Sequence, residues 1–440
     1  MTQQINPILT CDSYKYSQHP DVYVPGMKAA YGYIEPRIKQ KKIVVAGITP
    51  FLKDFLRPIT KEDIEEAEFL VNGHGEPFNR PFWDRILNKF GGHFPMKIRG
   101  LPEGTVTDSS KATVSVLSDD PETCTIGSHF ETAMQRSVWY MSTIASQGLE
   151  LYKMLKWFYD HGSDNPSNIL FGVNDFAQRG VTSYESAMLG GMAHLIYFMG
   201  TDNVAALRAA RHYYGAGIAG YSVPASEHSV QCSFGKDNQR QYLKTMLDKY
   251  AKKGATVSIV LDGYDVYREA AELCSGDLRQ QIIDSGAKVV FRPDSGDMFE
   301  VVPRLLAMQE AAFGFIINSK GKKVIQHVGI IQGDGINPTT AGMLMQRVFD
   351  LGYAPECVVL GSGGGLLQSV TRDTDKYAQK TSCILVGDTW IDTVKDPITD
   401  PGKKSKGGFQ DTPDFVSFYD YGDRPHITKW DEMKARALNF

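Results

Sequence analysis

Residues 328–365 have the sequence VGIIQGDGINPTTAGMLMQRVFDLGYAPECVVLGSGGG, and this stretch decides the fold class. The apolar run Val328–Ile331 predicts a buried strand, Pro338–Phe349 has helical spacing, and Cys357–Leu360 predicts a second strand. A strand, a helix and a strand in such close succession are typical of two parallel strands joined by a crossover helix. The stretch therefore predicts an α/β domain with a parallel sheet.

The same alternation precedes this stretch from about residue 168. It predicts further strands at 168–176, 220–223, 257–261 and 288–291, and helices at 183–198, 237–252, 264–274 and 301–312. Repeated units of this length predict parallel strands with crossover helices, arranged either as a barrel or as an open doubly wound sheet.

The two ends of the chain have a different character. The first hundred or so residues predict a small α+β or β-rich domain, with short segments of mixed periodicity at 28–34 and 104–116 and helical spacing at 61–72. A long helical stretch at about 128–159 is a plausible bridge into the second domain. After about residue 378 the chain becomes irregular and basic, and it could return to the N-terminal domain. We therefore predict two domains, residues 1–150 together with 379–440, and residues 151–378.

Composition sets limits on location and partners. The chain has 440 residues, 47 basic and 51 acidic side chains and a formal net charge of -4, so no general attraction to nucleic acid or anionic membrane is expected. The N-terminal residues 1–20 have no signal-peptide pattern and no apolar run reaches the length of a membrane span, which predicts a cytoplasmic protein. Six cysteines without a C-x-x-C pair indicate reduced thiols.

Polar residues follow the predicted strands one after another. In chain order they are Asn174-Asp175, Glu227-His228, Asp262, Arg292-Pro293-Asp294, Gly333-Asp334-Gly335 and Gly361–Gly365. A single aspartate after a strand is more often a helix cap than a catalyst. The carboxyl ends of parallel strands meet at one edge, however, so six polar ends in succession favour an enzyme.

The glycine cluster Gly361–Gly365 could hold phosphate, because backbone amides in a loop without Cβ atoms can point at phosphate oxygens. Leu366 occupies the position that would complete a Rossmann fingerprint, and the Lys-Ser/Thr of a Walker loop is missing. The alternative is that the cluster forms only a tight turn and binds no phosphate. Arg372 could add a cation to the same phosphate, or lie on a solvated helix face.

His228 is the best catalytic candidate among the ten histidines, because it lies between a predicted strand and helix with carboxylates available. Such a histidine can be a base, a metal ligand or a covalent phosphate carrier, although a structural hydrogen bond is the commoner role. Asp262 or Asp294 could orient its imidazole.

These same segments contain distinctive words that occur in order along most of the chain. The chain resembles the nicotinamide phosphoribosyltransferase family, a branch of the type II phosphoribosyltransferases, in these words: Asp12-Ser13-Tyr14-Lys15, Arg179-Gly180-Val181, Gly200-Thr201-Asp202, Gly220–Ala225, Glu227-His228-Ser229, Arg292–Gly296, Ile331–Gly335 and Gly361–Gln368.

The resemblance implies an irregular (β/α) barrel with a second α+β domain built from both termini. It also implies a homodimer whose active sites are shared between subunits, with Phe176 and the partner's Tyr14 stacking on the pyridine ring. Asp202 matches the residue that binds the amide nitrogen, and Ser258 and Arg292 match groups around the same amide. A buried carboxylate at Asp202 would accept the NH2 of nicotinamide and repel nicotinic acid, so we expect the amide as substrate.

For the second substrate, phosphoribosyl pyrophosphate, the resemblance implies contacts spread over several loops. The expected phosphate contacts are Arg179, Gly364, Gly365, Arg372 and Lys395, and the expected ribose contacts are Gly333 and Asp334. Mg²⁺ would accompany the pyrophosphate, with ligands that the sequence leaves unknown. His228, oriented by Asp262, matches the histidine that takes phosphate from ATP, and Asp294 completes the expected catalytic group.

The chain departs from the family pattern at two positions, and two other functions stay open. Family members tend to have His-Asp-Phe-Gly-Tyr-Arg where this chain has Asn174–Arg179, so the Asn174 and Gln178 differences affect contacts at the edge of the ring. The chain could instead be a nicotinate phosphoribosyltransferase of the same fold, with Asp202 turned away from the pocket, or a non-catalytic dimer that binds pyridine nucleotides.

Overall fold

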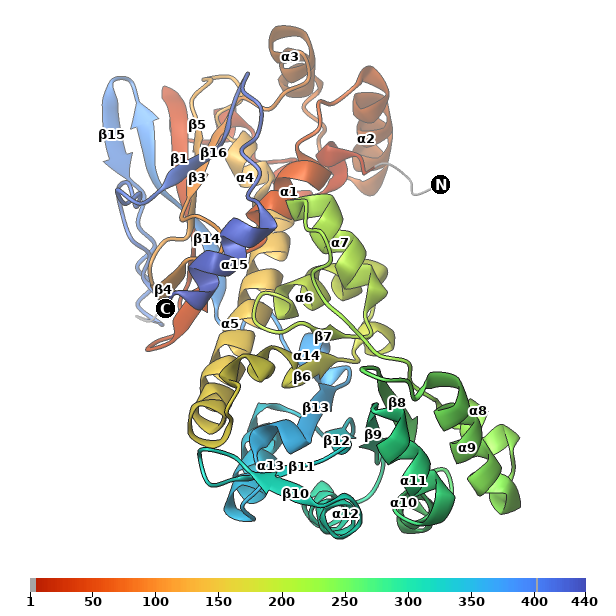
Figure 1. Ribbon diagram of the computed structural model, residues 1–440. Helices are drawn as coiled ribbons and strands as arrows, with labels where there is room; N and C mark the ends of the chain where they lie inside the picture. The colour runs from red at the N-terminus through yellow and green to blue at the C-terminus, as the bar shows by residue number, and fades with distance from the viewer. Residues whose placement is uncertain (1–4, 401–402) are drawn as a thin grey trace. The chain divides into compact units, whose positions relative to one another are not determined.

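The computed structural model describes residues 5–400 and 403–440, and the chain divides into two compact units (Figure 1). The barrel unit comprises residues 147–208 and 217–369, and the terminal unit comprises residues 1–146, 209–216 and 370–440. The predicted boundaries are residues 150 and 378. The structure also adds to the terminal unit the short segment 209–216, which belongs to a helix that the prediction did not include.

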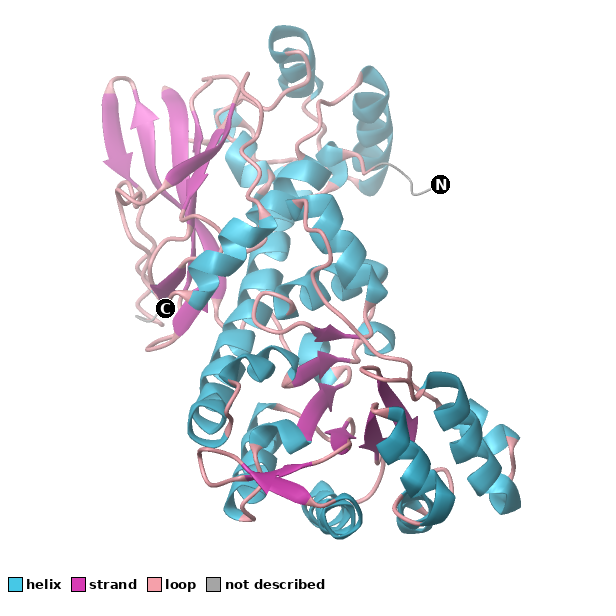
Figure 2. Ribbon diagram, in the orientation of Figure 1, coloured by secondary structure: helices cyan, strands magenta, loops and turns pink. Residues whose placement is uncertain are grey.

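The barrel unit is built on a six-stranded parallel sheet with the order β7-β6-β13-β12-β9-β8 (Figure 2). Its strands are β6 (Val173–Asp175), β7 (Gly200–Thr201), β8 (Thr256–Val260), β9 (Lys288–Arg292), β12 (Val328–Gln332) and β13 (Val358–Ser362). Tyr221 forms a single parallel bridge to Gly200 of β7, and Ala225 forms one to Ser258 of β8. The segment 221–225 thus lies between the two edge strands of a curled sheet, which confirms the predicted irregular barrel.

Helices alternate with these strands. They are α6 (Tyr184–His194), α7 (Val204–Tyr214), α8 (His228–Ser233), α9 (Gln239–Tyr250), α10 (Val266–Leu273), α11 (Gly276–Ser285), α12 (Met298–Phe313), α13 (Pro338–Asp350) and α14 (Gly365–Gln368). Local chemistry explains where they begin. At α13 the Asn337 side chain accepts hydrogen bonds from the backbone N–H groups of Thr339 and Thr340, and Pro338 occupies the first turn.

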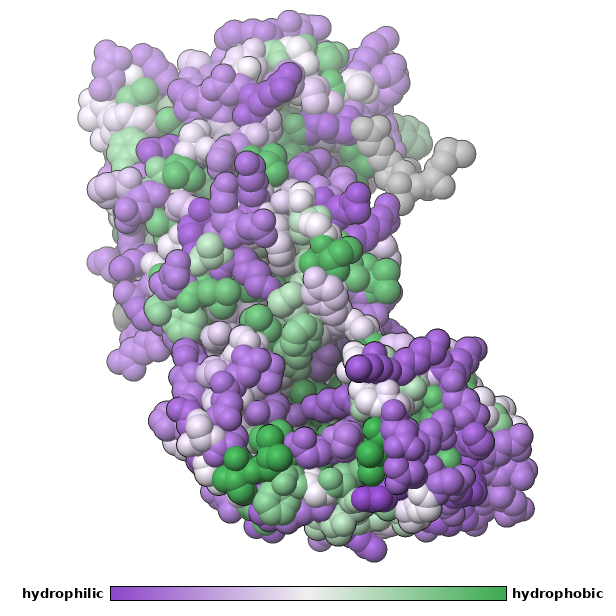
Figure 3. All heavy atoms as spheres, in the orientation of Figure 1, coloured by the Kyte–Doolittle hydropathy of each residue, from purple (hydrophilic) through white to green (hydrophobic). Residues whose placement is uncertain are grey.

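The predicted strand 220–223 is wrong as a strand, because this segment makes only single bridges to its neighbours. The hairpin of β10 (Phe315–Ile317) and β11 (Lys323–Ile325) was not predicted. Figure 3 shows apolar side chains over this hairpin on a mostly hydrophilic face, and Phe315, Ile316 and Ile317 are all exposed. A short strand exposed on both faces has no alternation of apolar and polar residues, so periodicity does not reveal it.

The terminal unit contains a six-stranded sheet with the order β15-β14-β1-β5-β3-β16. Its strands are β1 (Met27–Pro36), β3 (Lys97–Gly100), β5 (Val114–Ser118), β14 (Tyr377–Val386), β15 (Thr389–Asp392) and β16 (Val416–Asp420), and β2 (Lys42–Val44) pairs separately with β4 (Val106–Asp108). Strand β1 pairs antiparallel with β5 on one side and with β14 on the other. The prediction of an irregular tail after residue 378 is therefore wrong, because that tail supplies strands that need partners from the N-terminal part.

The helices of the terminal unit are α1 (Ile48–Phe55), α2 (Lys61–His74), α3 (Arg80–Phe90), α4 (Ile126–His129), the first part of α5 (Glu131–Gly162) and α15 (Trp430–Leu438). Helix α2 begins with a capping box between Thr60 and Asp63. Buried aromatic side chains join several of these elements, as where Phe130 packs edge-on against Phe51 and Phe94. This contiguous core gives the terminal unit its own hydrophobic stabilisation.

The structure also bears on two expectations from composition. All six cysteines are free, and Cys124, Cys357 and Cys383 are buried. Within the described ranges, none of the helices combines the length and the apolar character needed to cross a bilayer.

Candidate active site

His228 and Asp262 lie together in the barrel unit. His228 is the first residue of α8, Asp262 follows β8, and His228 Nε2 lies 2.9 Å from Asp262 Oδ1. The other carboxylate oxygen of Asp262 accepts a hydrogen bond from the Ser295 hydroxyl. The Asp262 side chain is 6% exposed and the His228 side chain 45% exposed, so a buried carboxylate holds an imidazole that solvent can reach. Of the two carboxylates considered from the sequence, Asp262 is the one that bonds His228.

A cavity of about 340 Å³ opens among the strands of the same unit. Four predicted substrate-binding residues line it: Phe176, Asp202, Ser258 and Arg292. Its other walls include the apolar side chains of Val223, Val290 and Ile330. A mostly apolar pocket of this size with a few polar groups suits a small aromatic ligand.

Two polar atoms at this cavity have no hydrogen-bond partner among the described residues. They are Ser258 Oγ, on β8, and Arg292 Nε, at the end of β9, and both are buried. A second nitrogen of the guanidinium, Nη2, donates to the backbone oxygen of Ser226 at 2.6 Å, which fixes the orientation of the side chain. Buried polar groups are normally paired, so these two donors are suited to an acceptor supplied by a ligand.

Asp202 follows the two-residue strand β7 and lines the cavity. Its Oδ1 accepts a hydrogen bond from Ser222 Oγ at 2.6 Å, which orients the carboxylate. The expectation that this carboxylate is buried is wrong for the single chain, because Asp202 is exposed. It lies just beyond the end of a very short strand, where few neighbouring residues cover it.

Phe176 packs directly over Gly361, the first glycine of the cluster. A Cβ atom on Gly361 would lie 2.2 Å from Phe176 Cε2, which is far inside van der Waals contact. The backbone N–H of Phe176 donates to Ser362 O at 2.9 Å and holds the two strand ends together. Gly361 is therefore needed for the ring to lie so close to the backbone of β13.

Among the remaining glycines of the cluster, Gly364 serves close backbone packing. A Cβ atom on Gly180 would lie 2.6 Å from the Cα of Gly364, so the loop that carries Arg179 meets the loop that carries Gly364 and Gly365. Gly364 has φ -50° and ψ -31°, which any residue can adopt. Close approach, and not an unusual backbone conformation, explains this glycine.

Asp294 and the Gly333-Asp334 turn also lie near each other. The position of a Cβ atom on Gly333 would be 3.1 Å from Asp294 Oδ1 and 3.6 Å from Phe176 Cε2. Asp334 is exposed, and its backbone oxygen accepts from Gln332 Nε2 at 2.9 Å. The barrel unit thus brings together the predicted groups for the pyridine, the ribose and part of the phosphate.

Tyr14, Arg372 and Lys395 belong to the terminal unit. Tyr14 is 54% exposed, and Arg372 forms an exposed ion pair with Asp373 at 3.1 Å. Lys395 belongs to a group of cations near Lys380 that also contains Arg37 and Lys15. Burial, followed by these cations, lowers the pKa of Lys380.

Sequence reasoning did not identify Arg37 and Lys380. Lys380 lies within β14, in a tail that was expected to be irregular, so no pattern indicated its neighbours. Like charges gathered at a partly buried place usually have an anionic ligand or counter-charge, and here Glu131 is the nearby carboxylate.

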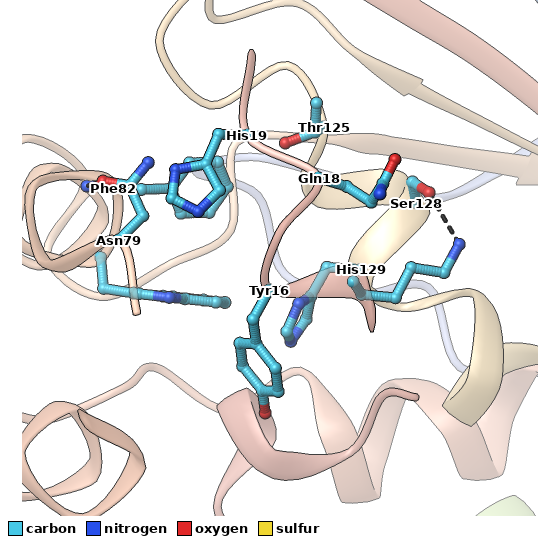
Figure 4. A pocket seen from close by; sticks show the side chains of 10 residues that line it. Tyr16, Gln18, His19, Asn79, Phe82, Thr125, Ser128 and His129 are labelled. Atoms are coloured by element: carbon cyan, nitrogen blue, oxygen red, sulfur yellow. Dashed lines mark hydrogen bonds between the residues drawn. The ribbon is translucent and has the colours of Figure 1, made fainter. Parts of the chain in front are cut away.

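Figure 4 shows a second cavity, which lies within the terminal unit and is lined by residues that include Tyr16, His19 and His129. Its volume is about 20 Å³, which is enough for one water molecule and too small for a pyridine ring. The dashed line marks the hydrogen bond of 2.9 Å from Lys15 to Ser128. Lys15 also pairs with Glu131 at 2.6 Å, which anchors the segment that presents Tyr14 to solvent.

Comparison with known proteins agrees with this arrangement. Residues 171–421 match the nicotinate phosphoribosyltransferase (NAPRTase) family, and residues 6–98 match the nicotinamide phosphoribosyltransferase N-terminal domain. The chain is 43% identical to the nicotinamide phosphoribosyltransferase of Xanthomonas campestris pv. campestris (strain 8004), over 92% of this chain and 86% of that protein. It is 29% identical to the nicotinamide phosphoribosyltransferase of Acinetobacter baylyi, over 93% and 88% of the two chains.

Solved structures with low sequence identity share the fold. A nicotinate-nucleotide pyrophosphorylase from Pyrococcus furiosus is 13% identical and superposes with a TM-score of 0.62, covering 100% of this chain and 96% of that one. Human nicotinic acid phosphoribosyltransferase is 15% identical with a TM-score of 0.54, covering 86% and 75%.

Proposed function

Because the chain belongs to the nicotinamide phosphoribosyltransferase family, we propose that it makes nicotinamide mononucleotide and pyrophosphate from nicotinamide and phosphoribosyl pyrophosphate. Such a pentosyltransferase would serve NAD biosynthesis by salvage of nicotinamide, in the cytoplasm. The observation that carries the proposal is the pair of unpartnered donors, Ser258 Oγ and Arg292 Nε, at a cavity that Asp202 also lines.

An aromatic amide complements these groups. Its carbonyl oxygen can accept hydrogen bonds from Ser258 and Arg292, while its NH2 group can donate to the Asp202 carboxylate. Nicotinic acid has no donor for Asp202, and its carboxylate would be repelled by that side chain. Arg292 would attract the acid, so the charge of Asp202 is what favours the amide.

Stacking would hold the ring. Phe176 offers one aromatic face, and Tyr14 of the partner subunit would cover the other in a homodimer with shared sites. The exposure of Tyr14 on its own unit supports this arrangement. A mixture of the Tyr14→Ala and Phe176→Ala variants tests it, because random hybrids have one intact site and should restore about a quarter of the activity. A mixture that stays as inactive as its components would contradict shared sites.

The reaction depends mainly on positioning. The lone pair of the pyridine nitrogen forms the bond to C1 of the ribose while the bond from C1 to the pyrophosphate oxygen breaks, and pyrophosphate leaves with that electron pair. Asp294, which lies close to Gly333, would stabilise the positive charge that develops on the sugar, and Asp334 would bind ribose hydroxyls. Backbone amides at Gly364 and Gly365, together with Arg179, Arg372 and Lys395, would bind phosphate oxygens.

Mg²⁺ is expected to neutralise charge on the pyrophosphate. Across the described residues no group of three His, Cys, Asp or Glu side chains could hold a metal ion. This fits an ion that is bound chiefly by substrate phosphates with one or two carboxylates, of which Asp294 is a candidate.

His228 would couple ATP hydrolysis to the synthesis. Its Nε2 is engaged by Asp262, so Nδ1 is the nitrogen left to attack the γ-phosphorus of ATP. The bond from that phosphorus to the ADP oxygen breaks, ADP leaves, and water later hydrolyses the phosphohistidine. A carboxylate that holds the neutral imidazole in one tautomer suits this role.

The decisive assay supplies the purified protein with Mg²⁺, phosphoribosyl pyrophosphate and either nicotinamide or nicotinic acid. We expect a strong preference for nicotinamide, and a much weaker preference in the Asp202→Asn variant because the repulsion of the acid is removed. Preference of the wild-type protein for nicotinic acid would overturn the choice of substrate. If the protein turned over neither nicotinamide nor nicotinic acid, that result would favour the non-catalytic dimer that binds pyridine nucleotides.

A further inference from the structure

Near the His228–Asp262 pair, two buried glutamines form a hydrogen-bonded pair of their own. Gln231 on α8 and Gln239 at the start of α9 are both almost completely buried. Gln231 Nε2 donates to Gln239 Oε1 at 2.9 Å, and Gln239 Nε2 donates to the backbone oxygens of Gln231 at 3.2 Å and Gly235 at 2.8 Å. Buried amides are costly unless paired, and a paired network favours one conformation over others.

The remaining acceptor of the pair reaches the loop after β8. Gln231 Oε1 accepts a hydrogen bond of 3.0 Å from the backbone N–H of Gly263, the residue directly after Asp262. A Cβ atom on Gly263 would lie 2.5 Å from this same oxygen, so the side-chain amide lies against the bare backbone. The contact therefore requires both the glutamine and the glycine.

Two parallel links join α8 to this loop. His228 and Gln231 are three residues apart on one short helix, so their side chains lie on neighbouring positions of the same face. One link is the bond of 2.9 Å from His228 to Asp262, and the other is the bond from Gly263 to Gln231. Ser295 holds only the carboxylate of Asp262, so it cannot set the position of the helix.

We propose that Gln231 is a positioning residue that fixes where His228 lies relative to Asp262, and so keeps the imidazole in the tautomer that accepts phosphate at Nδ1. The proposal rests on the phosphohistidine role of His228 proposed above. Gln231 lies in the interior, and acts on the reaction only through the histidine and its carboxylate.

The test compares three variants of the full chain. Gln231→Met keeps the length of the side chain and removes both its donor and its acceptor, leaving Gly263 N–H and Gln239 Oε1 buried without partners. The double variant Gln231→Met/Gln239→Met also removes the Gln239 acceptor that the single variant leaves unpaired, which restores part of the lost stability, while Gly263 N–H stays unpaired in both variants. Gln280→Met is the matched control, because Gln280 is an exposed helix residue bonded only to Asp284.

Two measurements separate positioning from simple stability. One is the rate at which acid-labile label from γ-labelled ATP appears on His228. The other is the ¹⁵N spectrum of the His228 imidazole, identified by its loss in His228→Ala. We expect Gln231→Met to take up label roughly tenfold to hundredfold more slowly and to show averaged tautomers. The double variant should regain part of the lost thermal stability while its labelling stays slow, and Gln280→Met should match the wild-type protein.

Two results would overturn the proposal, and a third separates it from the ATP coupling on which it rests. The first is a wild-type labelling rate with a single tautomer in Gln231→Met. The second is a double variant that recovers labelling together with stability, because that shows a purely structural role. The third is a wild-type protein that takes up no label, which would show that the proposed ATP coupling fails. The tautomers of His228 in Gln231→Met then test the positioning role alone. A single unchanged tautomer refutes that role, and averaged tautomers support it.

Discussion

The two six-stranded sheets of this chain differ in where their strands end. All strands of the barrel sheet run in parallel, so their carboxyl ends and the residues Asp202, Asp262 and Arg292 meet at one edge. Neighbouring strands of the terminal sheet run in opposite directions, so their end residues are divided between two edges. Charged residues there mostly pair with each other, as Arg99 does with Asp411 at 2.7 Å.

This difference implies a division of roles. Substitutions at the carboxyl edge of the barrel sheet should impair chemistry and leave stability largely intact, whereas substitutions in the terminal core should affect stability first. The cations around Lys380 are the exception to this division, because Lys395, a proposed phosphate contact, is one of them.

The largest expected effect is that of Asp262→Asn. An asparagine offers His228 Nε2 a donor, so the imidazole turns to the tautomer with its proton on Nδ1 and loses the nucleophilic lone pair there. We expect phosphorylation of His228 to slow by roughly ten-thousandfold, by analogy with the same substitution in a catalytic triad, with little change in melting temperature.

Asp248→Asn is the matched control, because Asp248 lies exposed on α9 and pairs only with neighbouring surface side chains. A labelling rate for Asp262→Asn within about threefold of the control, less than 1 kcal/mol of barrier, would show that the carboxylate does not set the tautomer.

The second effect concerns the terminal core and pH. Burial lowers the pKa of His129 from 6.5 to about 4, so the unfolded chain binds more protons than the folded one between these values. The free energy of unfolding should therefore fall as the pH drops from 7, by about 2 kcal/mol at pH 5 from this group. Denaturant unfolding of the wild-type protein and of His129→Gln checks this, since the variant should lose less stability over the same range.

A parallel pH dependence in the two proteins would show that other groups titrate instead. The bond of 2.9 Å between His129 Nε2 and Ile8 O makes glutamine a suitable replacement, because its NH2 group can also donate to a carbonyl.

The smallest of the three effects compares two glycines of the same cluster, Gly361 at the end of β13 and Gly363 just after it. Gly361→Ala places a Cβ atom against Phe176, whereas nothing lies within 4 Å of a Cβ atom on Gly363. We expect Gly361→Ala to displace the ring and lower kcat/KM by about tenfold, or roughly 1.4 kcal/mol, mainly through KM for nicotinamide. Gly363→Ala should keep the wild-type value, and equal losses in both variants would mean that the loop backbone, not the ring, is what matters.

Much of the barrel unit follows from local patterns. The apolar runs at 257–261, 288–291 and 328–331 predict strands that the structure has within a residue or two, and the polar residues after them predict the site. Strand β7 has only two residues, which is too short for any periodicity to reveal, although Asp202 follows it.

The strands of the terminal unit are much harder to predict from local patterns. Strand β14 pairs with β1 across more than three hundred residues of chain, and β16 pairs with β3 over a similar separation. The residues of β14 and β16 carry no local pattern that identifies the strand with which they pair. The sequence therefore predicts an irregular tail and gives no indication of Lys380.

The sequence by itself determined the alternation of strands and helices in the barrel unit, the polar strand ends and the family, because these depend on spacing along the chain and on distinctive words. Only the tertiary structure decided that Asp262 and not Asp294 bonds His228, that Ser258 and Arg292 keep free donors at a cavity, and that Gln231 reaches Gly263. The reason is physical: hydrogen-bond partners and burial depend on which segments meet in space, and closure of a barrel brings together loops that no local pattern connects.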